Sequence, residues 1–218
     1  MTTAQQILEA AYARSTANDP GKLAIDAELL GRLNRSYQGL YALAARQRPD
    51  DFAVQTPAQL LGALAQYTLP ADLIEIRRIE TTALVKVHLI PMTEKDRGWH
   101  IAPSMYRAGN ILYSRLLTGD PAAGTLVYLW LVTAGTPLVA LGSVVDVAYP
   151  TRHIDILVND LALYLDAKDE DRDPAQYQKL VADQAMKLAA FAQDFNLDAS
   201  ALEFVHSPAV RVPAGPVK

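Results

Sequence analysis

Residues 150–195 carry two apolar stripes at helical spacing, joined by a run of charge. The first stripe lies within 154–165 and the second within 177–192. The connection at 168–172 consists of five charged residues, so it must lie in water. Asp173 follows it and is placed to cap the second helix. The pattern predicts an antiparallel helical hairpin with one apolar face that other elements must cover.

Helices upstream of this hairpin are predicted to supply the cover. Thr3 and Gln6 form a candidate capping box at the start of a short helix. A longer helix follows, and its apolar stripe lies within 29–44. Residues 56–64 begin with the sequence Thr-Pro-Ala-Gln, which resembles the start of the second hairpin helix. They predict a further short helix.

Between the two helical parts, the periodicity changes to that of short strands. Residues 83–90 alternate in the manner of a strand, and residues 125–133 form a dense run of Val, Leu and aromatic residues. Turn signals separate these runs, which favours a small antiparallel sheet or sandwich.

The predicted fold class is therefore α+β. Residues 1–70 and 150–197 are expected to form an antiparallel helical bundle of N- and C-terminal helices. Residues 71–149 are expected to form a small antiparallel β insertion that interrupts the bundle. An extended C-terminal tail is expected at 198–218.

The tail contains three prolines within residues 207–218, which forbid a helix and disfavour a strand. One interpretation is a disordered tail. The other is a docking arm, because a proline-rich extended segment loses less conformational entropy on binding than a free coil does. The candidate partner-binding residues of this arm are Val210, Arg211, Val212 and Val217.

Composition limits the possible functions. Half of the 218 residues are hydrophobic, enough for a sizeable core, and the net charge is −4 at pH 7. An acidic chain argues against a general nucleic-acid binder. The absence of cysteine excludes disulfides and thiolate chemistry. The first six residues lack the features of a signal peptide, and the longest apolar run, 126–134, is too short to span a bilayer. No membrane partner is predicted.

An acidic run in the hairpin connection imitates a calcium-binding loop. Asp169, Asp171 and Asp173 match the first, third and fifth positions of an EF-hand, but Pro174 and Leu180 occupy the sixth and twelfth. A solvated turn is the better interpretation. The glycine spacing of a phosphate-binding loop occurs at 119–124, where the required lysine is missing.

The remaining chemical side chains are scattered. The four histidines lack the spacing of metal ligands: His88, His100, His153 and His206. Trp99 and Trp130 could stack a sugar or a base, but a core or interface role is favoured. Arg77 and Arg78 could contact phosphate, although paired surface charges are the preferred interpretation. No catalytic residue, cofactor or metal site is predicted, and the chain is not expected to be an enzyme.

Three groups of residues follow one another in a recognisable order. They are residues 25–34 with 48–50, residues 67–73 where the helical part passes into the β part, and residues 164–189 with the acidic-linked hairpin. In this order the chain resembles the head-to-tail adaptor (connector) proteins of tailed bacteriophages. The likeness covers most of the chain in layout and rests on packing and turn motifs.

The resemblance implies a structural virion protein located at the neck, between head and tail, and assembled in the host cytoplasm. Copies of the chain would form a twelvefold ring under the portal protein, with tail proteins (tube, nozzle or fibre) attached below. Genomic DNA would pass through the lumen without specific binding. An acidic chain suits such a lumen, because DNA carries dense negative charge.

Two other classes remain open. One is a different phage structural component, such as a tail-completion, tail-tube or baseplate protein, which would bind tail proteins without the portal. The other is a carbohydrate-binding module that uses the β part and its tryptophans, which a glycan array would reveal.

Overall fold

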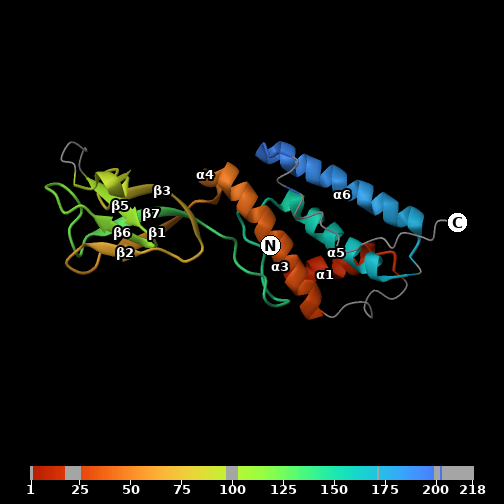
Figure 1. Ribbon diagram of the computed structural model, residues 1–218. Coiled ribbons are helices and arrows are strands. Elements are labelled where there is room, and N and C mark those ends of the chain that lie inside the picture. The colour runs from red at the N-terminus through yellow and green to blue at the C-terminus, as the bar shows by residue number, and fades with distance from the viewer. Residues whose placement is uncertain (1, 18–25, 97–102, 171, 199–201, 203–218) are drawn as a thin grey trace. The chain divides into compact units, whose positions relative to one another are not determined.

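The computed structural model describes residues 2–17, 26–96, 103–170, 172–198 and 202. The chain divides into two compact units, whose elements are labelled in Figure 1. The helical unit comprises residues 1–47 and 135–218, and the β-rich unit comprises residues 48–134. Each unit is described by itself.

Four α-helices make up the described part of the helical unit: α1 (Ala4–Arg14), α3 (Asp26–Gln47), α5 (Ile154–Lys168) and α6 (Pro174–Phe195). A 3₁₀ turn, η2 (Thr151–His153), precedes α5. The predicted hairpin is α5 with α6, and both predicted caps are confirmed. Thr3 and Gln6 form the capping box of α1. The Asp173 side chain accepts hydrogen bonds from the first backbone N–H groups of α6.

Helix α5 is the centre of this unit, because it packs against α1, α3 and α6. Apolar residues on several sides of α5 are buried: Ile156, Leu157, Val158, Leu161, Ala162 and Leu165. A helix that buries more than one stripe belongs in a core and not on a surface. The α3 face against it is apolar as predicted, with Leu33 and Leu40 fully buried.

Polar side chains of α5 are buried as well, and each is satisfied by another segment. Asp160 accepts two hydrogen bonds from the Arg32 guanidinium of α3, at 2.6 and 3.1 Å, and one from the Ser36 hydroxyl at 2.7 Å. Two further buried side chains of α5 are hydrogen-bonded in the same way. Asn159 bonds to Arg14 and Asp183, and Asp166 bonds to Ser15 and Thr16. These contacts fix α5 against three neighbouring segments, because a buried polar group left unpaired would be costly.

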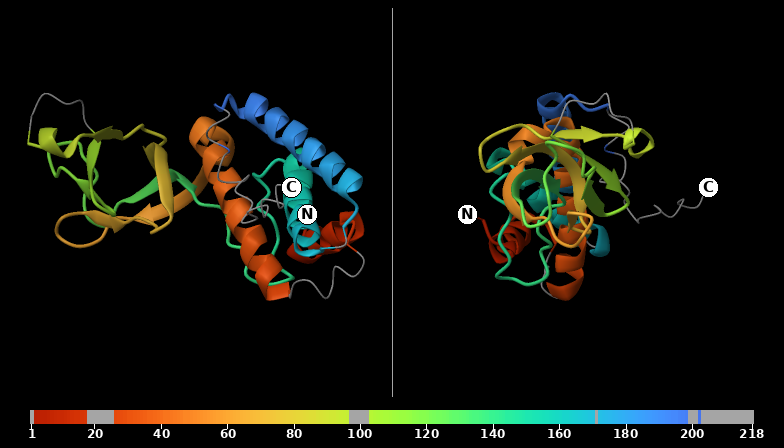
Figure 2. Two further views of the ribbon diagram at one scale, coloured as in Figure 1. Left: turned by 45° about the vertical axis from the view of Figure 1, so that its right-hand side comes forward. Right: turned by 90° about the vertical axis from the view of Figure 1, so that its left-hand side faces the viewer.

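The β-rich unit contains two sheets in its described residues. The three-stranded sheet has the order β1 (Val54–Gln59), β7 (Leu126–Thr133), β3 (Leu73–Thr81). The four-stranded sheet has the order β2 (Gln66–Thr68), β6 (Ile111–Ser114), β5 (Ser104–Ala108), β4 (His88–Ile90). A short helix, α4 (Pro49–Phe52), precedes β1, and a 3₁₀ turn, η1 (Met92–Glu94), follows β4. Figure 2 shows the strands curving around one interior.

Both sheets contribute to a single buried apolar cluster inside this unit. Its members include Leu129 and Leu131 from the three-stranded sheet and Met105 and Leu112 from the four-stranded sheet. The unit therefore has a core of its own, distinct from that around α5.

The predicted architecture, a helical bundle interrupted by a small antiparallel β insertion, is wrong. Within the described residues the structure is α+β, with five helices and two sheets of three and four strands. The β part is a separate unit with its own core, and its β4–β5 pairing is parallel. Its bounds, 48 and 134, also differ from the expected 71 and 149.

The short helix predicted at 56–64 is also not formed. Residues 54–59 are strand β1, which pairs with β7. Pro57 is tolerated there because β1 lies at the edge of its sheet, where a missing N–H interrupts no second ladder. Most of the expected tail at 198–218 lies outside the described residues.

Candidate functional site

The four predicted contact residues of the C-terminal arm, Val210, Arg211, Val212 and Val217, lie outside the described residues, as do Trp99 and His100. The docking arm therefore stays a prediction. Across the ranges that the structure describes, no group of three or more His, Asp or Glu side chains could hold a metal ion. Nor does any helix in those ranges have the length and apolar character needed to cross a membrane.

The β-rich unit has an open cleft of about 720 Å³ beside β3. The Arg78 guanidinium in it lies 5.0 Å from the centre of the Trp130 ring and pairs with the buried carboxylate of Glu80. Arg77 binds both carboxylate oxygens of Asp50, at 2.9 and 3.2 Å, and this contact raises the pKa of Arg77. The interpretation of the two arginines as paired charges is confirmed.

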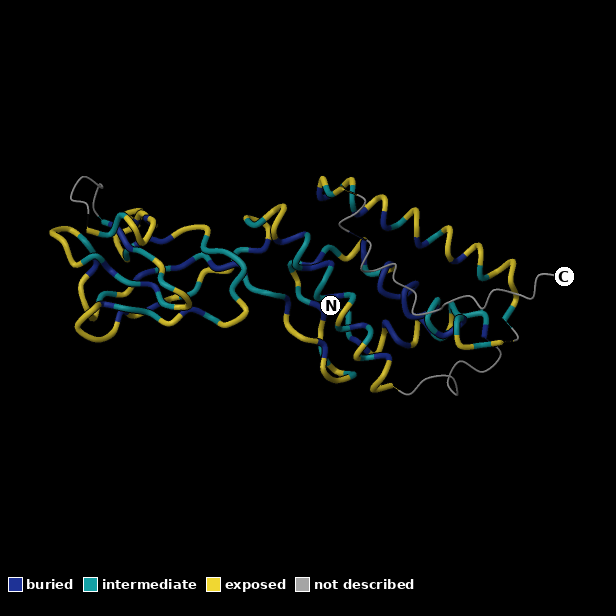
Figure 3. The backbone as a smooth tube through the Cα atoms, in the orientation of Figure 1, coloured by how far each residue is buried: buried dark blue, intermediate teal, exposed yellow. Residues whose placement is uncertain are grey.

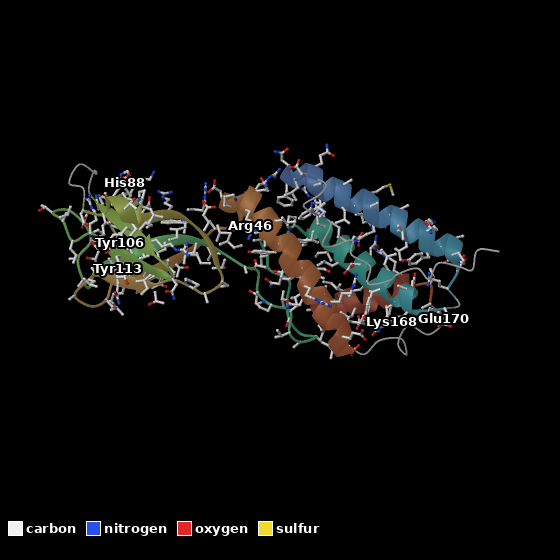
Figure 4. All side chains as sticks on the ribbon, viewed as in Figure 1. Arg46, His88, Tyr106, Tyr113, Lys168 and Glu170 are labelled. Atoms are coloured by element: carbon white, nitrogen blue, oxygen red, sulfur yellow. The ribbon has the colours of Figure 1, made fainter. Side chains whose placement is uncertain are left out.

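A second feature of the unit is a pair of tyrosines on the four-stranded sheet. Tyr106 and Tyr113 are cross-strand neighbours whose ring centres lie 5.3 Å apart with an interplanar angle of 15° (Figure 4). Each ring covers one face of the other, which stabilises the β5–β6 pairing.

The most unusual surface lies at one end of the β-rich unit. Gln59, the last residue of β1, is opposite Leu126, the first residue of β7. Thr81, the last residue of β3, is opposite Val127. Strands β1 and β3 therefore end where β7 begins, at the opposite end from the one where the chain enters and leaves the unit.

Three connecting segments lie at this end: residues 60–65, 82–85 and 115–125. Backbone hydrogen bonds tie the first and third together. The Leu60 N–H donates to the Thr125 carbonyl at 3.0 Å, and the Gly124 N–H donates to the Leu60 carbonyl at 2.8 Å. The second segment is a tight turn that closes on Thr81, whose N–H donates to the Val85 carbonyl at 2.9 Å.

These segments and the first residue of β7 expose large apolar side chains, and we call this surface the apolar end. Its members are Leu61, Leu64, Leu84, Val85, Leu116, Leu117 and Leu126. Figure 3 colours the turns of this unit as exposed. The charged residues in the three segments are Arg115 and Asp120, which pair with each other at 3.1 Å and have side chains only 2% and 0% exposed. Within 60–65, 82–85 and 115–125 no charged side chain is exposed, but the exposed Lys86 directly follows the second segment and lines the cleft beside β3 together with Leu84.

Two leucines of the apolar end have backbone conformations that leucine rarely adopts. Leu84 and Leu116 both have φ of +61°. That left-handed region costs a residue with a Cβ roughly 1–2 kcal/mol. Burial does not offset the cost, since the two residues are 72% and 48% exposed. Residues held in such conformations cluster at functional sites, which makes these two turns candidates for one.

The sequence did not reveal this surface. Leu84 fits the alternating pattern that predicts a strand at 83–90. Neither a leucine nor the residues beside it indicate a positive φ at that position. One available signal was the composition of 60–65 (Leu-Leu-Gly-Ala-Leu-Ala), which is apolar where a turn between strands is usually polar.

No family model matches the chain, and no curated protein matches it significantly. The interpretation of the apolar end therefore depends on its own chemistry.

Proposed function

We propose that the protein is a structural virion protein, the head-to-tail adaptor that forms a ring between the portal and the tail of a tailed bacteriophage. The observation that supports a structural role is the apolar end. A cluster of exposed apolar side chains is typical of a surface that binds another protein. Lys86 and Arg78 line the cleft beside Leu84, so cations border this surface, and its exposed apolar side chains are what favour a protein partner.

The charge distribution supports the passage of DNA through such a ring without binding. The β-rich unit, residues 48–134, contains eight basic and eight acidic residues, so the net charge of −4 belongs to the helical unit. Neither unit has the excess of Lys and Arg on which nucleic-acid affinity depends. The assignment to the phage neck itself comes from the resemblance of the sequence to adaptor proteins.

The deciding experiment is mass photometry with negative-stain imaging of the purified protein, alone and with the portal protein of its phage. The proposal expects closed rings, twelvefold by the resemblance, and binding to the portal. A protein that stays monomeric in both samples would contradict it. Binding to tail proteins without the portal would instead indicate a tail-completion or baseplate component.

The C-terminal arm provides a second test of the same function. Deleting residues 207–218 should leave the melting temperature close to that of the parent, while it weakens ring formation or portal attachment. Co-sedimentation with the portal measures this. Equal binding by the truncated and full-length proteins would remove the arm from the proposal.

A further inference from the structure

The cleft beside β3 contains one cation that has no acidic partner. The three cations that line it are Arg77, Arg78 and Lys86. Arg77 pairs with Asp50 at 2.9 Å. Arg78 pairs with Glu80. Lys86 is exposed, and in the part of the chain that the structure describes its ammonium group has no acidic partner. The two carboxylates of the lining are thus already taken, and one positive charge is left unmatched.

Lys86 is held on a fixed backbone and has apolar neighbours. It is opposite Glu80 of β3 in an antiparallel bridge. Leu84, which is 72% exposed, and Trp130 line the same cleft. A fixed cation beside exposed apolar side chains suits a carboxylate that belongs to a protein segment, because such a segment can cover the apolar groups as well.

The densest run of carboxylates in the chain lies in the helical unit, between α5 and α6. Residues 169–173 contain four acidic residues and one arginine. Glu170, labelled in Figure 4, is exposed, and its carboxylate has no partner among the described residues. Pro174 and Ala175 follow the run and are also exposed. We call residues 169–175 the hairpin tip; it offers an unpaired carboxylate next to a small apolar surface.

We propose that the cleft of one copy binds the hairpin tip of a neighbouring copy, with the Lys86 ammonium group paired to the Glu170 carboxylate. Charge selects this occupant, because the cleft has one unmatched cation and the hairpin tip has an excess of negative charge. The exposed Leu84 supplies apolar surface for Pro174 in the same contact.

The same charges disfavour contacts between identical surfaces. Two clefts would bring two unmatched lysines together, and two hairpin tips would oppose two acidic runs. The favoured contact therefore joins different surfaces. Such a contact repeats from copy to copy, and it forms a ring when its rotation closes.

This inference rests on the proposed ring and names the contact that builds it. Nucleic acid is a poorer occupant of the cleft, because Asp50 and Glu80 lie among its cations. The single positive charge that remains matches one carboxylate and not a row of phosphates.

Two charge reversals test the pair. Lys86→Glu and Glu170→Lys each place like charges together, so each should raise the protein concentration needed for half-assembly by about tenfold. An equimolar mixture of the two variants should assemble like the parent. In a ring with an even number of copies the two variants can alternate, and every contact then joins opposite charges again.

Lys179→Glu is the matched control, because Lys179 is an exposed lysine on α6 that has no partner within the described ranges. Alone it should assemble like the parent. Mixed with Glu170→Lys, it should not raise assembly above the average of the two proteins. Mass photometry measures all of these samples. A mixture of Lys86→Glu and Glu170→Lys that assembles no better than either variant alone would overturn the inference.

A cross-link on the unmodified protein tests the contact without any substitution. A carbodiimide joins a lysine amine to a carboxylate that it touches, and a mixture of isotopically light and heavy copies shows whether the link lies between copies. We expect peptides that join Lys86 of one copy to residues 169–173 of another. Links between these sites only within one copy, or none at all, would overturn the inference.

Imaging of the unmodified protein separates this inference from the proposed function. Rings that form with or without the portal, together with no link between Lys86 and the hairpin tip, would refute the contact and leave the adaptor role standing. The absence of rings in every sample, with no portal binding, would refute the adaptor role and the contact with it.

Discussion

The helical unit and the β-rich unit differ in which energetically unfavourable placement they contain: buried polar side chains in the first, exposed apolar side chains in the second. The helical unit buries charged and amide side chains of α5, and each has a partner, as Asp160 has Arg32 and Ser36. The β-rich unit does the reverse, since it exposes leucines at its apolar end and holds two of them at positive φ. The fold explains the buried polar groups, because they join α5 to its neighbours. It does not explain the exposed leucines, so we propose that they contact another protein.

Removing a buried partner in the helical unit should have the largest effect on stability. The Asp160 side chain is 4% exposed and neutralises Arg32, so Asp160→Ala leaves a largely buried guanidinium unpaired. We expect the free energy of unfolding to fall by about 3–5 kcal/mol. Denaturant titration measures it, with Asp155→Ala as control, because the Asp155 side chain is 52% exposed. Equal effects of the two changes would show that the buried pair is not special.

Two leucines allow the same truncation in both regions. Leu161 is fully buried in α5, whereas Leu61 is exposed at the apolar end. Leu161→Ala should lower the free energy of unfolding by about 2–5 kcal/mol, and Leu33→Ala on the facing helix should behave alike. Leu61→Ala should leave the unfolding curve almost unchanged and weaken ring formation. If Leu61→Ala destabilises as strongly as Leu161→Ala, Leu61 belongs to the core and the comparison fails.

Relieving the strained turns should stabilise the monomer while it damages association. Asparagine tolerates positive φ better than leucine does, so Leu84→Asn and Leu116→Asn should each raise the free energy of unfolding by about 1 kcal/mol. The same changes remove apolar side chains from the contact. Thermal melts and mass photometry of the same samples test both effects. Ala83→Asn, in the same turn, is the control for a polar substitution alone. A stabilised variant that still assembles normally would show that the leucines are merely tolerated.

The smallest expected effect is a pH dependence from the helical unit. Burial lowers the pKa of His153 below its usual 6.5, although the hydrogen bond with Asp194 acts in the opposite direction. The unfolded chain then takes up a proton more readily than the folded chain as the pH falls below about 6.5. The His153 contribution to stability is complete above that pH and is lost at lower pH. Denaturant titrations at pH 7 and pH 5 should show a smaller loss for His153→Gln than for the parent. An equal or larger loss in the variant would contradict the sign.

Local signals predicted the helical hairpin and the caps of α1 and α6, but the same signals failed at β1. The sequence Pro-Ala-Gln follows a capping residue at both Asp173 and Thr56. After Asp173 it starts helix α6, whereas after Thr56 it lies in strand β1. What differs is the partner: residues 54–59 pair along their whole length with β7, which is about seventy residues away in the chain. Pairing over such a distance overrides local propensity and cannot be read from a short window.

The candidate surface was hidden for a related reason. Whether Leu84 is exposed depends on the turn that returns the chain from β3 to Val87, and Val87 is placed by its hydrogen bond to Ile79. The buried polar residues of α5 were equally hidden, because Asp160 reads as solvent-facing until Arg32 is placed beside it. Apolar periodicity identifies what is buried, but it does not identify paired polar groups in a core or apolar groups kept for a partner.

The division of roles between the two units is tested most directly by one variant that changes only the apolar end. Leu61→Ser, Leu84→Asn and Leu116→Asn are combined, and mass photometry of the triple variant is compared with that of the parent at equal concentration. We predict that the parent forms rings and that the variant is mainly monomeric, with a melting temperature equal to or above that of the parent. Identical mass distributions for the two proteins would contradict the assignment of the apolar end to protein contact.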